Sequence, residues 1–144
     1  YPPPFRRLLG EALAAATLLS ATIKINGSLH LQIQGEGPVS LVLVEVTAQR
    51  TLRGLAQWRG EVPAGGLIDQ VGQARLMLTI DPGEGGERYQ GLVAVEDESL
   101  QATLESYFSQ SEQLATRLWL TASEQRACGM LLQKLPGHND DDDE

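Results

Sequence analysis

The sequence predicts an α+β fold, a single domain in which a largely antiparallel or mixed β-sheet packs against two long helices. Apolar residues recur at helical spacing in two segments, about 5–21 and about 99–113. Several shorter segments instead alternate apolar and polar residues with the period of two that is typical of strands. Because the helices interrupt the strands without strictly alternating with them, the pattern favours α+β over α/β.

The first helix is expected to follow Tyr1-Pro2-Pro3-Pro4, since each proline disfavours helical geometry in the residue before it. Five alanines within 5–21 favour helix formation. The second helix is expected to be capped by Asp97 or Ser99, and its apolar stripe runs from Leu100 to Phe108. A short helix is predicted over 65–72, closed by glycine.

The predicted strands span residues 29–34, 39–46, 51–58, 73–80, 88–95, 117–122 and 128–135. Asn26-Gly27 before the first of them is a strong hairpin-turn signal, because both positions tolerate positive φ. The segment 39–46 (VSLVLVEV) is apolar on both faces, which predicts a strand placed centrally in the sheet.

The net charge of −8 makes nucleic acid an unexpected partner, because the chain as a whole repels phosphate backbones. Five of the acidic residues lie in 138–144 (HNDDDDE), a run of like charge that is expected to be solvated. We therefore expect a core domain over 1–137 and the acidic start of a linker over 138–144.

No apolar stretch approaches the roughly 20 residues that a membrane-spanning helix needs, so no membrane partner is expected. No secretory signal pattern is visible at the start. Cys128 is the only cysteine, which excludes an internal disulfide and fits a reducing cytoplasm. A lone strand cysteine of this kind is expected to be buried and inert.

The residues of the sequence give little support for a catalytic function. His30 and His138 are the only histidines, and neither lies where it would serve a Ser or Cys nucleophile. One cysteine and two distant histidines cannot supply a zinc site, so no metal or other cofactor is expected. The glycine-rich stretch 83–86 lacks the Lys-Ser/Thr of a phosphate-binding loop. We expect no enzyme, although a carboxylate pair assembled by folding stays open as an alternative.

Five segments together resemble the 33 kDa chaperonin (heat shock protein 33) family. They are residues 2–24, 29–47, 78–91, 107–120 and 128–136. The most specific pieces are 87–91 (ERYQG) and 107–113 (YFSQSEQ).

The resemblance implies a stress-response chaperone of the cytoplasm that holds unfolding proteins without ATP under oxidative stress. It implies a redox switch in a C-terminal domain, where four cysteines hold zinc when reduced and form disulfides when oxidised; none of those cysteines is in this chain. Members also begin with further residues that contribute strands to the core sheet, and we expect those residues to be missing here.

A holdase needs apolar surface for its clients, because unfolded proteins share exposed apolar groups and little else. The doubly apolar strand suggests a client-binding surface made by Val42, Val44, Met77 and Trp119. Alternatively, the chain's own helices cover Val42 and Val44. The competing functions are a dimerisation module without client affinity and a hydrolase with a carboxylate pair.

Self-association is the last expectation. A sheet that lacks its flanking strands keeps an unpaired edge, and unpaired backbone groups recruit another chain. Exposed apolar area that no linker covers also favours self-association. We therefore expect a homodimer.

Overall fold

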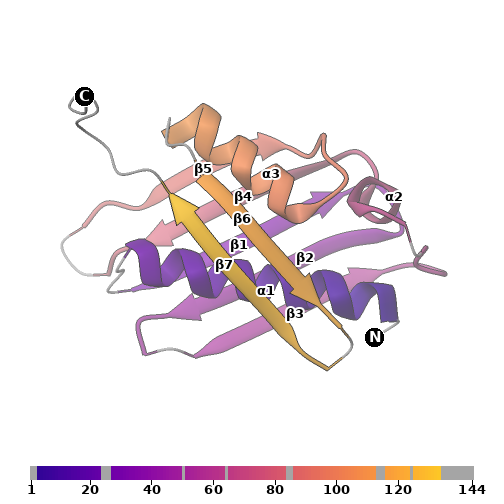
Figure 1. The fold of residues 1–144 in the computed structure, drawn as a ribbon, viewed down its shortest axis with the longest axis horizontal. Helices are drawn as coiled ribbons and strands as arrows, with labels where there is room; N and C mark the ends of the chain where they lie inside the picture. The colour runs from indigo at the N-terminus through magenta and orange to yellow at the C-terminus, as the bar shows by residue number, and fades with distance from the viewer. Residues whose placement is uncertain are drawn as a thin grey trace.

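The computed structural model describes residues 3–23, 27–49, 51–63, 65–83, 86–112, 116–123 and 125–133. These residues form three layers: a five-stranded sheet, a layer of helices, and a two-stranded hairpin nearest the viewer (Figure 1). The expected α+β class with a largely antiparallel sheet is confirmed. The predicted acidic segment 138–144 lies outside the described residues.

Every neighbouring pair in the large sheet is antiparallel, with strand order β3-β2-β1-β4-β5. The strands are β1 (Ser28–Gly35), β2 (Val39–Thr47), β3 (Leu52–Trp58), β4 (Ala74–Asp81) and β5 (Tyr89–Ala94). The doubly apolar β2 lies inside the sheet but next to an edge, and β1 occupies the central position that was predicted for β2. The edges are β3 and β5.

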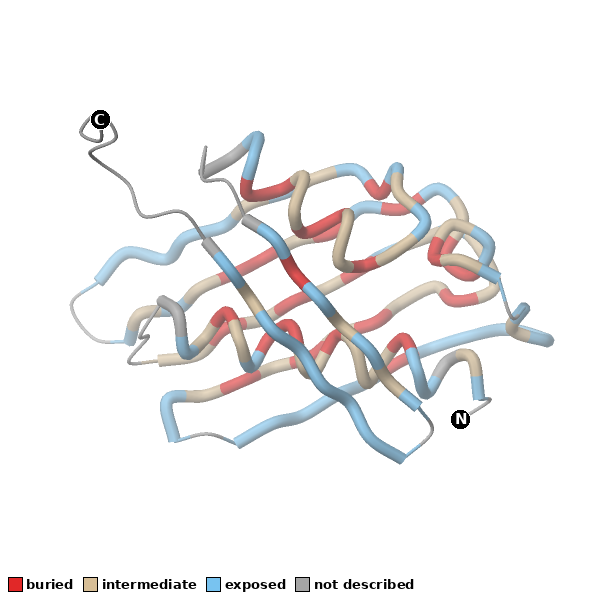
Figure 2. The backbone as a smooth tube through the Cα atoms, viewed as in Figure 1, coloured by how far each residue is buried: buried red, intermediate tan, exposed pale blue. Residues whose placement is uncertain are grey.

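Helix α1 (Pro3–Ile23) lies across one face of the sheet, which we call the inner face. Its alanines at 12, 15 and 16 are fully buried, and their small side chains let the helix approach the strands closely. Leu31, Val42 and Val44 are buried on this same face, so the main core forms between α1 and the sheet (Figure 2).

The second long helix is shorter than predicted. Helix α3 (Leu100–Tyr107) passes into a π-helix, η1 (Phe108–Glu112), and Gln113 lies outside the described residues. Ser99 is the N-cap, since its Oγ accepts a hydrogen bond from the Ala102 N–H at 3.1 Å. A short helix, α2 (Leu67–Val71), closes one end of the sheet.

The hairpin of β6 (Thr116–Ala122) and β7 (Ala127–Gln133) crosses α1 on the side away from the sheet (Figure 1). Small residues allow the close approach. A Cβ added at Gly10 would lie 3.1 Å from the Ala122 Cβ, and one at Gly129 would lie 2.8 Å from a Leu18 methyl group. Helix α1 is therefore packed between two sheets.

Side chains of α3 bind the outer edge of β6. The Leu118 N–H donates to Glu105 Oε2 at 2.7 Å, and the Leu120 N–H donates to Gln101 Oε1 at 3.0 Å. Residues four apart on a helix face the same side, as residues two apart do on one edge of a strand. Two helical side chains thus replace the neighbouring strand that β6 lacks on this edge.

The two most specific sequence pieces contact each other through their tyrosines, of which only Tyr107 is buried. Tyr89 of the ERYQG segment hydrogen-bonds through its hydroxyl to the hydroxyl of Tyr107, the first residue of YFSQSEQ. A Cβ on Gly91 would overlap the Tyr107 ring, so glycine at this position makes room for the buried tyrosine. Tyr89, Gly91 and Tyr107 therefore hold β5 and α3 in contact.

Replacement of Glu105 tests the capping of the β6 edge. We expect Glu105→Ala to lower the free energy of unfolding by about 1–3 kcal/mol, because it leaves the N–H of the buried Leu118 without an acceptor. Glu105→Gln is the matched control: it keeps an acceptor oxygen and loses only the exposed ion pair with Arg117, worth at most about 1 kcal/mol. Urea titrations followed by tryptophan fluorescence give both values, and equal losses in the two variants would contradict the capping role.

Candidate functional site

Within the described residues, α1, α3 and the hairpin lie on the inner face of the sheet, and α2 lies at its end. The opposite face, which we call the open face, is covered by none of them. Because side chains alternate along a strand, the strand registers define which residues share this face and how they form rows across the sheet.

One row of the open face is polar. It runs through Arg53, Glu45, His30, Thr79 and Gln90, one residue from each strand. Glu45 is the centre of its charged end, with Oε1 3.0 Å from Arg53 Nη2 and Oε2 3.2 Å from His30 Nε2. At the other end, Gln90 Nε2 donates to Thr79 Oγ1 at 3.2 Å.

The charged end of this polar row holds Glu45 in its ionised form. The side-chain hydrogen bond from Arg53, together with the nearby His30, lowers the pKa of Glu45 below its ordinary value, against a smaller opposing effect of burial. A hollow of about 470 Å³ lies over this end and is also lined by Leu43 and Leu55. The side chains of the polar row therefore bond to one another. Beside them, Leu43 and Leu55 give the hollow an apolar side.

The adjacent row is apolar except at its centre. It runs through Leu55, Leu43, Gln32, Met77 and Leu92 across all five strands. The two ends, Leu55 and Leu92, are 47% and 52% exposed, while Leu43 and Met77 are partly buried by their neighbours. We call these four residues, with Gln32, the apolar row.

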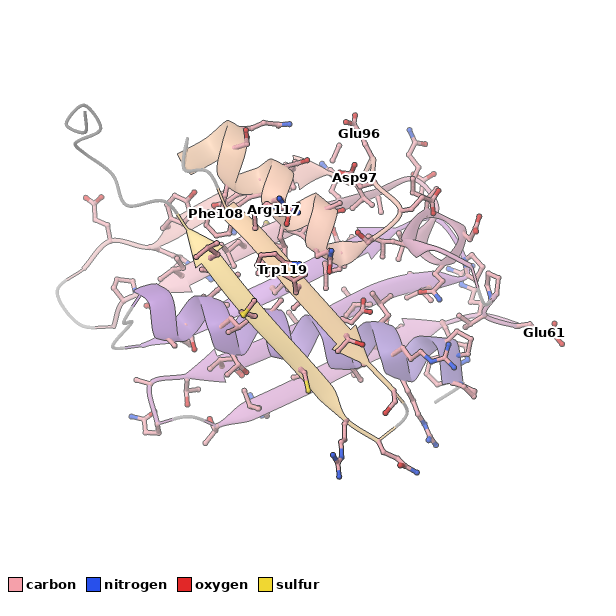
Figure 3. The ribbon with its side chains drawn as sticks, in the orientation of Figure 1. Glu61, Glu96, Asp97, Phe108, Arg117 and Trp119 are labelled. Carbon is pink, nitrogen blue, oxygen red and sulfur yellow. The ribbon has the colours of Figure 1, made fainter. Side chains whose placement is uncertain are left out.

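A second exposed apolar surface lies on the outer side of the hairpin, away from α1. Trp119, Met130 and Leu132 are all exposed there. The Arg117 guanidinium lies 5.6 Å from the centre of the Trp119 ring, and both side chains extend from β6 in Figure 3. The hairpin and the open face are on opposite sides of the molecule.

The four residues proposed from the sequence lie in three places. Val42 and Val44 are fully buried beneath α1 on the inner face, so the chain's own helix covers them. Met77 is in the apolar row of the open face, and Trp119 is on the hairpin. The structure does not bring the four together as one surface.

Sequence reasoning missed Leu55 and Leu92 at the ends of the apolar row. The available signal was the alternation within the two strands, but it does not tell which face a helix covers. Cys128 was expected to be buried and is exposed, because it lies on the outward side of the hairpin opposite Thr121.

A polar cavity of about 180 Å³ lies where α1, α2 and α3 begin, and the carboxylates of Glu11 and Glu98 both line it. Burial raises the pKa of Glu11 above its ordinary value. The described residues offer this cavity neither a histidine nor a nucleophilic cysteine.

Other site classes lack support in the part of the chain that the structure describes. It contains no group of three or more His, Cys, Asp or Glu side chains placed to hold a metal ion. Its helices also include none with the length and apolar character needed to cross a membrane.

Comparison with known proteins gives a consistent result. A family model described as "Hsp33 protein" matches residues 1–144. The "33 kDa chaperonin" of Nitrosococcus oceani is 54% identical over 144 residues, covering 98% of this chain and 50% of that protein. That of Shewanella sp. (strain ANA-3) is 50% identical over 141 residues, covering 97% of this chain and 49% of the other.

The fold is also similar to a solved structure. The crystal structure of the 33 kDa chaperonin from Thermotoga maritima superposes with a TM-score of 0.74 at 23% identity, covering 88% of this chain and 47% of that one. This chain spans about half the length of the relatives it matches.

Glu11 should make stability depend on pH. Since its pKa is raised on folding, the folded state holds the proton more tightly, and the stability present below the ordinary value of 4.5 is lost as pH rises through the raised pKa. We expect Glu11→Gln to raise the urea midpoint at pH 7, and this gain to shrink as the pH falls toward 4.5. Glu96→Gln, which removes an exposed carboxylate (Figure 3), controls for net charge. A gain from Glu11→Gln that is independent of pH would contradict the assignment.

Proposed function

This chain belongs to the Hsp33 family, and from that membership we propose that it is the client-binding core of a chaperone that holds unfolding proteins without ATP during oxidative stress. The observation that carries the proposal is the apolar row on the open face. It offers four apolar side chains to a partner without any rearrangement of the core.

The dimensions of the apolar row suit an unfolded segment. Five strands about 4.8 Å apart place its two ends about 19 Å from each other. An extended client repeats side chains of one face about every 6.8 Å, so roughly three of them can contact the row at once. Each apolar contact contributes through buried area, at about 25 cal/mol per Å². Such contacts are non-directional and therefore accept many sequences.

Polar residues flank the apolar row on both sides. On one side, Glu45 is paired with Arg53 and His30, so these groups do not compete for the client's own charges. On the other side the row is mixed, because Gln57, Gln34 and Arg75 are polar whereas Leu41 and Ala94 are apolar. The open face therefore offers apolar affinity within a solvated border, which limits uncontrolled aggregation of the chaperone itself.

Val42 and Val44 have a different role in this proposal. Their burial under α1 makes them core residues that meet a client only if α1 moves away. Met77 keeps its proposed role on the open face, and Trp119 marks the hairpin as the competing client surface.

The remaining features follow the family. We propose a cytoplasmic, non-catalytic protein that acts as a homodimer, with the zinc redox switch in a C-terminal domain of the whole protein. The alternative is a dimerisation module without client affinity. A chain that dimerises and yet fails to suppress aggregation of a client would favour that alternative.

Charge introduced into the apolar row should weaken client holding. We expect Met77→Lys and Leu92→Lys each to reduce, by severalfold, the suppression of light scattering by a thermally aggregating client, because an ammonium group at the contact must be desolvated. Trp119→Lys is the matched change on the hairpin and should have little effect. Urea titration checks that all three variants stay folded. Full suppression by both sheet variants together with loss in Trp119→Lys would move the client surface to the hairpin.

Oxidation should not switch this chain. Peroxide can form no intramolecular disulfide with one cysteine, so client suppression by the wild-type chain and by Cys128→Ser should stay within twofold after treatment. Light scattering before and after peroxide measures this. Activation of the Cys128→Ser variant would mean that a redox-sensitive group other than a cysteine controls client binding.

A further inference from the structure

We propose that a hollow at one end of the open face binds acidic side chains of client segments, and that Arg75 is the residue that recognises their carboxylates. The inference rests on the proposed function, because it names the class of client that the open face prefers. Such a client carries an acidic residue directly after an extended apolar stretch.

The hollow lies beside the apolar row. Its volume is about 440 Å³, and its lining includes Arg75, Gln34, Gln73 and Ala94. Arg75 precedes Met77 by two residues on β4, so both side chains project from the open face. Backbone positions two residues apart on a strand are separated by about 6.8 Å. A client segment on the apolar row therefore passes within reach of the long Arg75 side chain.

The neighbours of Arg75 across the sheet leave its guanidinium group without a counter-charge. Gln34 lies opposite it on β1 and Ala94 lies opposite it on β5, and both are uncharged. Within the part of the chain that the structure describes, no carboxylate forms an ion pair with the exposed Arg75. Arg53 differs, because Glu45 Oε1 accepts a hydrogen bond from its Nη2 at 3.0 Å. Arg75 is thus the arginine of the open face that is available to a partner.

The hollow also supplies uncharged hydrogen-bond donors. The side chains of Gln34 and Gln73 line it, and the described residues give neither amide group a hydrogen-bond partner. A guanidinium group presents its N–H groups in a planar fork that fits the two oxygens of a carboxylate. The two amide groups can donate to the same oxygens or to backbone carbonyls of the client. This set of donors fits an acidic side chain.

The methylene groups of Arg75 connect the hollow to the apolar row. A long arginine side chain can lie along apolar surface while its charged end stays in water. A client that places an apolar side chain against Met77 therefore contacts the methylene groups of Arg75 next, and the guanidinium group after them. The apolar contacts alone have no direction, whereas the hollow favours the orientation in which the acidic residue of the client lies at Arg75.

Negative charges of the chain oppose an acidic client, but they act from farther away. Glu36 also lines the hollow, and it follows Gly35, the last residue of β1, so it is farther along the chain than Gln34 from the apolar row. The net charge of −8 acts over longer distances, where charges more than about 8 Å apart are screened at physiological salt. A carboxylate in contact with Arg75 therefore interacts mainly with the guanidinium group.

Peptide binding tests the charge preference. Three fluorescein-labelled peptides share an extended segment with three alternating leucines and end in two glutamates, two glutamines or two lysines. We expect this chain to bind the glutamate peptide about threefold more tightly than the glutamine peptide, as for an exposed ion pair, and the lysine peptide most weakly. Fluorescence anisotropy gives the three dissociation constants. The glutamate preference should disappear at about 1 M salt, where the screening length is about 3 Å. Tightest binding of the lysine peptide would overturn the proposal.

Arg75→Gln tests the residue assignment. This variant should bind the glutamate and glutamine peptides equally, and its affinity for the glutamine peptide should stay within twofold of wild type because the apolar row is unchanged. Arg126→Gln is the matched control, since it removes an exposed arginine at the turn of the hairpin and should keep the threefold preference. Glu36→Gln should increase the preference. A preference that persists in Arg75→Gln, or that is lost equally in Arg126→Gln, would contradict the assignment.

Aggregation assays on the same proteins separate this inference from the proposed function. Equal binding of the glutamate and glutamine peptides by a wild-type chain that suppresses client aggregation would reject the carboxylate site and leave the holdase intact. Binding of neither peptide would reject the open face as the client surface, and this site with it. A glutamate preference that depends on Arg75, without suppression of client light scattering, would support the site and reject the holdase.

Discussion

The burial of α1 between two sheets is the constraint on which the rest of the structure depends. Buried alanines allow the helix to lie close to the large sheet, and Gly10 and Gly129 allow the hairpin to lie close to its other side. A helix covered on two sides can shield only one face of the large sheet. The open face is therefore a direct consequence of how α1 packs, and so is the outward position of Trp119 and Cys128 on the hairpin.

The strand edges follow from the same arrangement. Because the hairpin lies across α1 and apart from the large sheet, the edge of β6 needs another source of hydrogen-bond acceptors, which Gln101 and Glu105 of α3 provide. The edge of β3 receives no comparable cover from the described residues. The edge of β3 and the open face meet at Leu55, which is one end of the apolar row.

The candidate site was only partly predictable from the sequence. Met77 lies on the open face, whereas Val42 and Val44 are core residues under α1. The period-two alternation assigns the residues of β2 to two faces of the strand. It does not indicate which of these faces a helix will cover. The apolar row crosses five strands, so its residues are aligned only by the registers of four strand pairs. A local sequence pattern does not specify these registers.

The sequence by itself determined the α+β class, the strand segments, a helix cap at Asp97 or Ser99, and the resemblance to the Hsp33 family. These depend on local periodicity, capping chemistry and residue identity. Tertiary structure alone decided the strand order, the change from α- to π-helix after Tyr107, and the pairing of His30, Glu45 and Arg53. It also decided that the open face lies opposite α1. The reason is physical: local signals specify which backbone conformation a segment prefers, whereas faces, rows and edges exist only once distant segments are packed against one another.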